Sequence, residues 1–268
     1  MASHINPELD DEARQFYTST MELLNESGVP YLLGGAYALG HYTGLQRHTR
    51  DLDLFVREAD CKRILDILGE SGYKTEMTFP HWLGKAYSGD LYIDLIFSSG
   101  NAIAYVDDKW FEYSASAQVF GVDVKLCPAE EIIWSKSFIM ERERYDGADI
   151  AHLLRAKADS LDWDRLLMRF DKHWRVLLTH LILFGFIYPE EQHKIPGMVL
   201  ANLLDRVHAE IGVEQKTPLH LCQGTLLSRE QYLSDLANGE YTDARLQPYG
   251  NMSRGQLAHW TAAIAEKK

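Results

Sequence analysis

The spacing of hydrophobic residues divides the first half of the chain into helices and short strands. Apolar positions recur at helical spacing over residues 8–25 and 59–70, and residues 36–42 suit a short helix. Short apolar or alternating runs predict strands over residues 31–33, 51–56, 73–79, 91–97 and 119–126, the last with a bend at Gly121. This alternation favours an α/β (α+β) domain with a mixed sheet.

From Pro128 onward helical periodicity dominates. Pro128 with Glu130 and Glu131 is typical of a first helical turn, where a proline and acidic side chains are favourable. Further helices are predicted over residues 137–144, 148–158, 163–174, 176–186 and 198–211. Residues 228–231 resemble a capping-box helix start. We therefore predict an α/β domain over residues 1–127 and a mainly helical domain over residues 128–268.

Composition and charge are those of an ordinary globular chain. Of the 268 residues, 46% are hydrophobic and 25% charged. The 27 Lys and Arg against 39 Asp and Glu give a net charge of −12, which argues against a broad face for binding nucleic acid. A local basic groove or a cationic substrate stays compatible with this charge.

Two further features predict a cytoplasmic protein without a membrane segment. The three cysteines, Cys61, Cys127 and Cys222, show no metal-ligand spacing, which suits a reducing compartment. The first residues lack the pattern of a secretory signal, and the apolar run 176–188 is too short to span a bilayer.

Candidate chemistry begins at two aspartates on one predicted strand. Side chains alternate along a strand, so Asp51 and Asp53 point to one face while Leu52 and Leu54 point into the core. Two neighbouring carboxylates repel each other unless a cation lies between them, and Mg²⁺ prefers oxygen ligands. Asp94 interrupts another apolar strand, where an unpaired buried charge would be costly. If all three aspartates bind metal at one site, their presence on these two strands has a single explanation.

The residues around this strand suit phosphate chemistry. Gly34-Gly35 lies between a predicted strand and a predicted helix, where backbone N–H groups can approach phosphate oxygens closely. Arg47 and Arg50 could neutralise a polyphosphate. Taken singly, each signal has a structural explanation: an exposed acidic strand face, a turn, or solvated arginines. The chain has no P-loop, dinucleotide-binding, serine-hydrolase or zinc-protease motif.

Together these segments resemble the polymerase-beta-type nucleotidyltransferase superfamily, and within it the minimal and abortive-infection-toxin nucleotidyltransferases. The resemblance spans residues 28–155 and rests on the segments 34–35 (GG), 47–54 (RHTRDLDL) and 93–95 (IDL). The family usually has Gly-Ser where this chain has Gly34-Gly35, so a hydroxyl that could touch phosphate is missing.

The resemblance implies that residues 1–127 are a nucleotidyltransferase-like catalytic domain. Asp51 and Asp53 would hold the metals, and Asp94 would join the catalytic metal and help to deprotonate the acceptor. Gly34, Gly35, Arg47 and Lys136 would bind the nucleotide. The position of Lys136 on a predicted helix is equally compatible with an exposed lysine that has no role in binding. The nearby charged residues favour an ion-pair network over an acceptor-side role; they are Arg142, Arg144, Asp146 and Asp149.

The implied activity is transfer of a nucleoside monophosphate from an NTP to a hydroxyl or phosphate acceptor, with Mg²⁺ or Mn²⁺ as cofactor and pyrophosphate as the leaving group. The acceptor could be a small molecule, a protein or RNA. Two alternatives stay open from the residues. One is a non-catalytic protein of the same fold that binds a nucleotide or a partner, and the weaker one is a metal-dependent phosphohydrolase.

Overall fold

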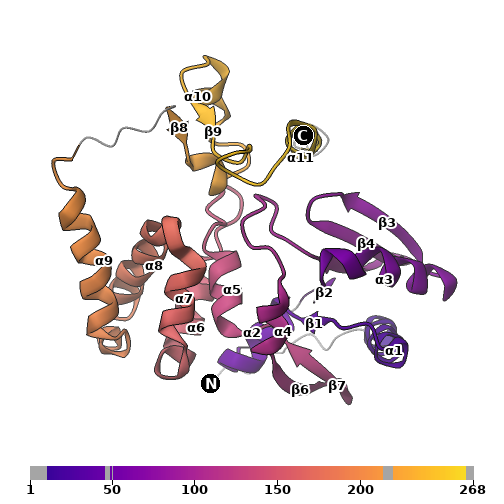
Figure 1. Cartoon of the computed structure of the whole chain (residues 1–268). Coiled ribbons are helices and arrows are strands. Elements are labelled where there is room, and N and C mark those ends of the chain that lie inside the picture. Colours follow the sequence, from indigo (N-terminus) through magenta and orange to yellow (C-terminus); the bar gives the residue numbers. More distant parts are fainter. Residues whose placement is uncertain (1–10, 46–48, 50, 214–219, 264–268) are drawn as a thin grey trace. The chain divides into compact units, whose positions relative to one another are not determined.

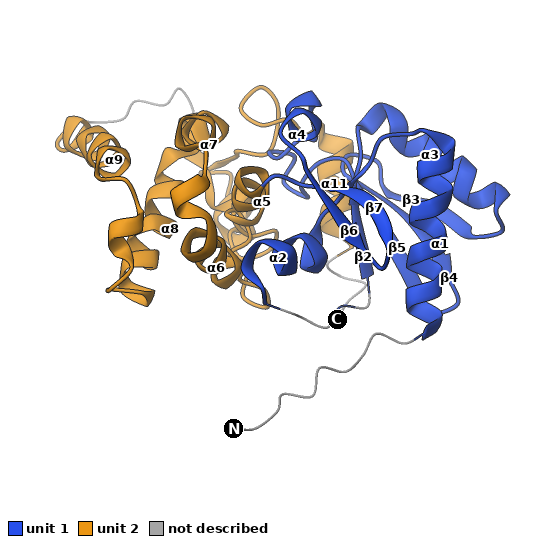
Figure 2. Ribbon diagram, turned by 90° about the horizontal axis from the view of Figure 1, so that it is seen from below, with its two compact units in different colours: residues 1–128 blue, residues 129–268 orange. Residues whose placement is uncertain are grey.

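The computed structural model describes residues 11–45, 49, 51–213 and 220–263 (Figure 1). The chain divides into two compact units, residues 1–128 and residues 129–268, which Figure 2 colours separately. Arg47, His48 and Arg50 lie outside the described residues. Each unit is considered by itself below.

The described part of the first unit is a mixed sheet with helices. Its helices are α1 (Asp11–Ser27), α2 (Gly35–Thr43), α3 (Glu58–Glu70) and α4 (Asp108–Glu112). Its strands are β1 (Leu32–Leu33), β2 (Asp51–Phe55), β3 (Lys74–Phe79), β4 (Leu83–Ser88), β5 (Leu91–Ile96), β6 (Ala115–Val119) and β7 (Val122–Leu126). The strand order is β3-β4-β5-β2-β1-β7-β6. The β1–β7 and β2–β5 pairs are parallel and the others antiparallel, so the predicted α/β class with a mixed sheet is confirmed.

The sheet has a buried face and a partly open face, as the alternation along β2 predicts. Leu52 and Leu54 are fully buried, whereas the aspartates on either side of Leu52 are half-buried. Gly84 lies opposite Leu95 in the β4–β5 ladder, and a Cβ at Gly84 would lie 3.1 Å from the side chain of Leu65 on α3. Helix α3 therefore packs on the face that carries Leu95, and the opposite face is left for the acidic residues.

The predicted strand over residues 119–126 is confirmed only over β7, because residues 119–121 form the end of β6 and a turn. The chain turns back at Phe120 and Gly121, which have φ angles of 54° and 85°, and forms the β6–β7 hairpin. Two left-handed residues in succession make the tight turn that joins antiparallel strands, so Gly121 marks the reversal of the chain and not a bend within one strand. Strands β4 and β6 and helix α4 were not predicted.

The second unit is mainly helical, which confirms the predicted character of this half. Its helices are α5 (Ala129–Lys136), α6 (Gly147–Lys157), α7 (Trp163–Phe170), α8 (Trp174–Ile187), α9 (Gly197–Glu210), α10 (Leu233–Ala237) and α11 (Arg254–Ala262). Short 3₁₀ turns are η1 (Ala158–Ser160), η2 (Asp171–His173), η3 (Gln192–Lys194) and η4 (Gly224–Leu226). Strands β8 (Leu221–Cys222) and β9 (Thr242–Asp243) form a small parallel pair.

The predicted helix over residues 137–144 is wrong. The Glu141 N–H donates to the Arg144 carbonyl at 2.8 Å, which closes a turn, and Met140 pairs with Tyr145 in an isolated bridge. The Met140 N–H donates to the carbonyl of Leu227 at 3.0 Å. This bond to a distant segment replaces a helical bond, and local periodicity cannot predict it.

Two acids at the start of α5 have a role that the sequence did not suggest. Glu131 is fully buried, and its carboxylate accepts from Arg165 Nη1 at 2.6 and 2.7 Å. Arg165 also pairs with Glu130 at 2.6 Å, and Arg169 pairs with Glu131 at 3.1 Å. These acids therefore join α5 to α7 through buried ion pairs, in addition to favouring the start of a helix.

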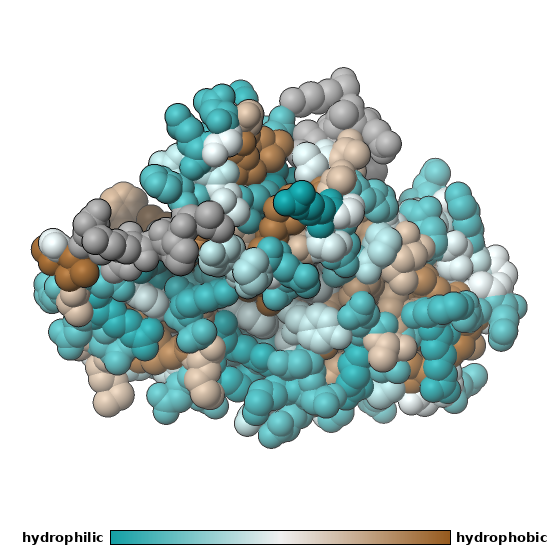
Figure 3. Space-filling model, turned by 45° about the horizontal axis from the view of Figure 1, so that its top comes forward, coloured by the Kyte–Doolittle hydropathy of each residue, from teal (hydrophilic) through white to brown (hydrophobic). Residues whose placement is uncertain are grey.

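None of the helices in the described ranges is long and apolar enough to cross a membrane. On the face shown in Figure 3, hydrophilic residues predominate and hydrophobic residues form small separate patches.

Candidate active site

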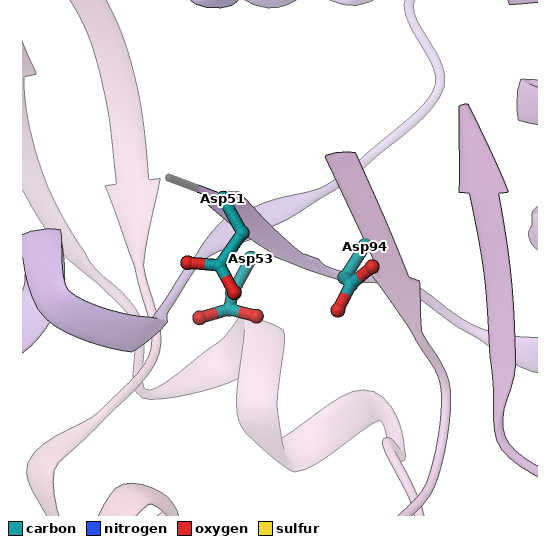
Figure 4. A group of neighbouring side chains, drawn as sticks. All are labelled: Asp51, Asp53 and Asp94. Atoms are coloured by element: carbon teal, nitrogen blue, oxygen red, sulfur yellow. The ribbon is translucent and has the colours of Figure 1, made fainter. Parts of the chain in front are cut away.

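Three aspartates meet on the open face of the sheet. Asp51 and Asp53 lie on β2 and Asp94 on β5, and all three side chains project to the same side (Figure 4). Asp53 lies directly opposite Asp94 in the parallel ladder, while Asp51 lies opposite Tyr92. One carboxylate oxygen from each aspartate lies within 4.8 Å of the other two, and each residue is half-buried.

This donor set fits a divalent cation that prefers oxygen. Three carboxylates at these distances repel one another, and partial burial weakens the solvent screening that would reduce the repulsion. A cation with two positive charges between them removes the repulsion and completes its coordination with water or substrate oxygens. The residues that could hold a metal are therefore Asp51, Asp53 and Asp94.

The surroundings of Asp94 alter its ionisation. Burial raises the pKa of the Asp94 carboxyl, and the nearby charge of Asp51 raises it further. The hydrogen bond and the positive charge of Lys85 act in the opposite direction but do not fully compensate. The Lys85 Nζ lies 2.5 Å from Asp94 Oδ1. The pKa of Asp94 thus stays raised although a lysine lies beside its carboxylate.

The glycine pair is fitted tightly against β2. The Gly34 N–H donates to the carbonyl of Asp53 at 2.9 Å, so this group serves the sheet and not a phosphate. Gly35 has a φ angle of +52°, and a Cβ there would collide with the Asp53 carboxylate. Helix α2 begins at Gly35, so the N–H groups of Gly35 and Ala36 have no partner within the helix. The N–H groups that could bind an anion are therefore those of the first turn of α2, next to Asp53.

Tyrosines surround the acids. Burial raises the pKa of Tyr17 on α1 to about 12, with further contributions from the charges of Asp51 and Asp53. Burial and the same charges also raise the pKa of Tyr37 on α2 and of Tyr92 on β5. These phenols therefore stay neutral at physiological pH.

Lys136 lies in the second unit, in the ion-pair network that the sequence favoured. Its Nζ lies 2.6 Å from Asp146 Oδ2 and 2.9 Å from Asp149 Oδ2. Arg144 donates to Asp146 through Nε and Nη2, both at 2.9 Å. Burial opposes ionisation of Asp146, but Arg144 and Lys136 outweigh it and hold the pKa of Asp146 below its usual value. The contact of Lys136 with a nucleotide stays a prediction, as does that of Arg47, which lies outside the described residues.

Lys85 and Tyr92 are the site residues that sequence reasoning missed, and a signal for both was available. Gly89 and Asp90 form the two-residue turn of the β4–β5 hairpin, since Ser88 pairs with Leu91. Counting back from this turn places Lys85 opposite Asp94. Tyr92 lies two residues before Asp94 and so shares its face of the strand.

A cavity of about 510 Å³ lies elsewhere in the first unit, at the end of α1 and beside β6 and β7. Asn25, Ser116 and Lys125 are among its lining residues, and no member of the acid cluster lines it.

Comparisons with solved structures find nucleotidyltransferases of distant sequence. The solution structure of the antibiotic-resistance factor ANT(2'')-Ia is 18% identical, covers 64% of this chain and 98% of its own, and has a TM-score of 0.47. The lincosamide antibiotic adenylyltransferase LnuA, with lincomycin bound, is 17% identical, covers 54% and 96%, and has a TM-score of 0.39. An antigenic nucleotidyltransferase-like protein from Paracoccidioides brasiliensis is 15% identical, covers 72% and 98%, and has a TM-score of 0.44.

No curated protein matches this chain. Residues 17–183, more than half of the chain, match a family described as "Uncharacterised nucleotidyltransferase". The match includes the glycine turn, the three aspartates and helices α5 to α7. The chain therefore belongs to this family of nucleotidyltransferases, within the polymerase-beta-like superfamily.

Proposed function

We propose that this protein is a metal-dependent nucleotidyltransferase that moves a nucleoside monophosphate from an NTP to a hydroxyl or phosphate acceptor and releases pyrophosphate. The observation that carries the proposal is the convergence of Asp51, Asp53 and Asp94, whose ligand oxygens lie within 4.8 Å of one another on two neighbouring strands. A purely structural acidic face has no need to bring three half-buried carboxylates together, because their repulsion costs stability.

The residues of the first unit have separate tasks in this reaction. Asp51 and Asp53 would hold Mg²⁺, with Asp94 as the third ligand. Bound there, the metal would neutralise charge on the phosphates and polarise the phosphoryl group that is attacked. The N–H groups of Gly35 and Ala36, at the start of α2, would bind phosphate oxygens next to Asp53.

Two basic residues complete the proposed nucleotide site. We assign Arg47 to the polyphosphate, because it precedes the aspartates by only a few residues in the chain. We assign Lys136 to the triphosphate or the base. In the structure Lys136 is paired with Asp146 and Asp149, so a nucleotide would have to compete with these two carboxylates.

The net charge of the chain is our basis for choosing which acceptor to test first. The chain has a net charge of −12, which favours the approach of a cationic small molecule over that of an acidic polymer. We therefore propose a cationic hydroxylated small molecule as the first acceptor to test, with protein and RNA acceptors in the same panel.

The test is transfer of label from each of the four α-labelled NTPs, with Mg²⁺, to an acceptor panel and to a metabolite extract, followed by mass spectrometry of labelled products. Asp94→Asn should abolish transfer. Asp90→Asn is the matched control, because Asp90 is an exposed acid in the turn of the same hairpin. If no NTP yields a labelled product and none binds in a Mg²⁺-dependent manner, the proposal is wrong. Mg²⁺-dependent binding without pyrophosphate release would favour the non-catalytic alternative.

A further inference from the structure

Lys85 is held beside the acid cluster from two sides. It lies opposite Asp94 in the β4–β5 ladder, and its Nζ is 2.5 Å from Asp94 Oδ1. The same Nζ lies 4.1 Å from the ring centroid of Tyr92, which lies on the same face of β5 as Asp94. The side chains of Lys85 and Asp94 are only 18% and 14% exposed. This ammonium group is thus enclosed by a carboxylate and an aromatic ring.

Another lysine of the same unit shows what a surface pair looks like here. Lys62 and Asp66 pair along α3 at 2.8 Å, but their side chains are 80% and 58% exposed. An exposed pair of this kind is screened by water and contributes little. The Lys85–Asp94 pair is largely shielded from solvent, so its charge acts strongly on its neighbours.

We propose that Lys85 is a built-in cation of the acid cluster, which neutralises Asp94 and thereby weakens the binding of a free divalent cation. The inference rests on the metal site of the proposed function. The three carboxylates carry a formal charge of −3, and Lys85, which also lies opposite Glu76 of β3, brings the sum for these four residues to −2. A metal that binds Asp94 must share this carboxylate with the lysine and tolerate a positive charge close by.

The consequence is that metal and nucleotide bind together. The cluster alone attracts a free cation weakly, because Lys85 already supplies part of the positive charge that the carboxylates need. The phosphates of an NTP add negative charge and so restore the attraction for a divalent cation. Lys85 thus makes tight metal binding conditional on the presence of nucleotide.

A role of Lys85 in positioning Asp94 would change the metal affinity in the opposite direction. If Lys85 served only to hold the Asp94 carboxylate in the orientation that a metal requires, its removal would weaken metal binding, as loss of an orienting partner does. Metal affinity therefore separates the two roles without any measurement of catalysis.

The experiment is titration of the full-length chain with Mn²⁺ in the absence of nucleotide. Electron paramagnetic resonance measures the concentration of free Mn²⁺ at each step and so gives the affinity. Lys85→Met should bind Mn²⁺ about tenfold more tightly or better, because a unit charge close to a divalent ion is removed. Lys85→Arg keeps the charge and should resemble the wild type. Lys125→Met is the matched control, since it removes a lysine from β7, which is three strands from β5 in the sheet.

A second measurement tests the coupling. A non-hydrolysable NTP analogue should increase the Mn²⁺ affinity of the wild type by a larger factor than that of Lys85→Met. Equal or weaker Mn²⁺ binding by Lys85→Met would overturn the inference. If Lys85→Met does not fold, Lys85→Gln is measured in the same way.

The outcomes also distinguish the two proposals. Equal Mn²⁺ binding by the wild type and Lys85→Met, lost in Asp53→Asn, would leave the metal site standing and remove only the role of Lys85. Absence of Mn²⁺ binding in both, with and without nucleotide, would remove the metal site itself.

Discussion

Asp53 and Asp94 lie directly opposite each other in the parallel ladder between β2 and β5. Their side chains leave the same face of the sheet, and Lys85 lies opposite Asp94 on the next strand. Repulsion across the β2–β5 pair therefore follows from the strand register. Cations such as the Lys85 ammonium group reduce this repulsion.

Asp53→Asn removes one of the repelling charges while keeping the shape of the side chain. The variant should fold at least as stably as the wild type, because one repelling charge is gone, but transfer should fall on the order of a thousandfold because a metal ligand is lost. Mg²⁺ should raise the unfolding temperature of the wild type through preferential binding to the folded state, and less so that of the variant. Thermal unfolding with and without Mg²⁺ checks this, with Asp90→Asn as control. Retained transfer by Asp53→Asn would refute the assignment.

Gly35→Ala should damage both the fold and the site. The alanine would be strained at a φ angle of +52°, and its methyl group would push the Asp53 carboxylate aside. Gly28→Ala is the control, since Gly28 has a φ angle of +68° but open space where the Cβ would go. Gly28→Ala should cost about 1 kcal/mol in the free energy of unfolding. Gly35→Ala should cost more and also weaken NTP binding in a calorimetric titration. Equal effects of the two substitutions on stability and binding would contradict this.

Tyr17→Phe should leave stability unchanged or raise it. The Tyr17 hydroxyl is buried and has no hydrogen-bond partner among the described residues, so its removal relieves an unfavourable burial. Tyr42→Phe is the contrasting variant, because the Tyr42 hydroxyl donates to the carbonyl of Cys127 at 2.9 Å. Its loss should cost about 1 kcal/mol. Urea unfolding of both variants measures the difference, and a clear loss of stability in Tyr17→Phe would show that its hydroxyl has a partner.

Asp243→Asn should lower stability in a pH-dependent manner. Asp243 and Arg245 are both buried and lie 2.7 Å apart. Burial opposes ionisation of Asp243, but its bonds to Arg245 outweigh this and hold the pKa of Asp243 below its usual value. The ionised pair therefore stabilises the fold above about pH 4, and this contribution is lost as the pH falls further through the lowered pKa.

At pH 7 the substitution should cost about 3 kcal/mol or more, because Arg245 stays buried without its partner carboxylate. The difference from the wild type should shrink as the pH falls below about 4 in denaturant unfolding. Asp66→Asn is the control, since the Lys62–Asp66 pair is exposed and should show almost no difference at any pH. A cost for Asp243→Asn that stays constant over this range would contradict the prediction.

The regular parts of the fold could be predicted because their signals are local. Strands β2 and β5 bury every second residue. Helix α3 has apolar residues at helical spacing, because one of its faces lies against the core and the other faces solvent. Strand β4 was missed because Gly84 and Lys85 interrupt its apolar pattern, and Gly84 is needed there for the close approach of α3. Residues 137–144 were assigned wrongly because a bond from Met140 to Leu227 outweighs their helical spacing.

The sequence by itself determined the chemical character of the site: the identity of the three carboxylates, the glycine pair before α2, and the side of each strand on which the acids lie. These follow from residue types and from the fixed alternation of a strand, which need no partner. Only the tertiary structure decided that β2 and β5 are neighbours in a register that sets Asp53 against Asp94, that the Gly34 N–H is used by the sheet, and that Lys85 supplies a positive charge to Asp94. Register and pairing depend on segments far apart in the chain. The balance of charge at the three aspartates is therefore a property of the folded sheet.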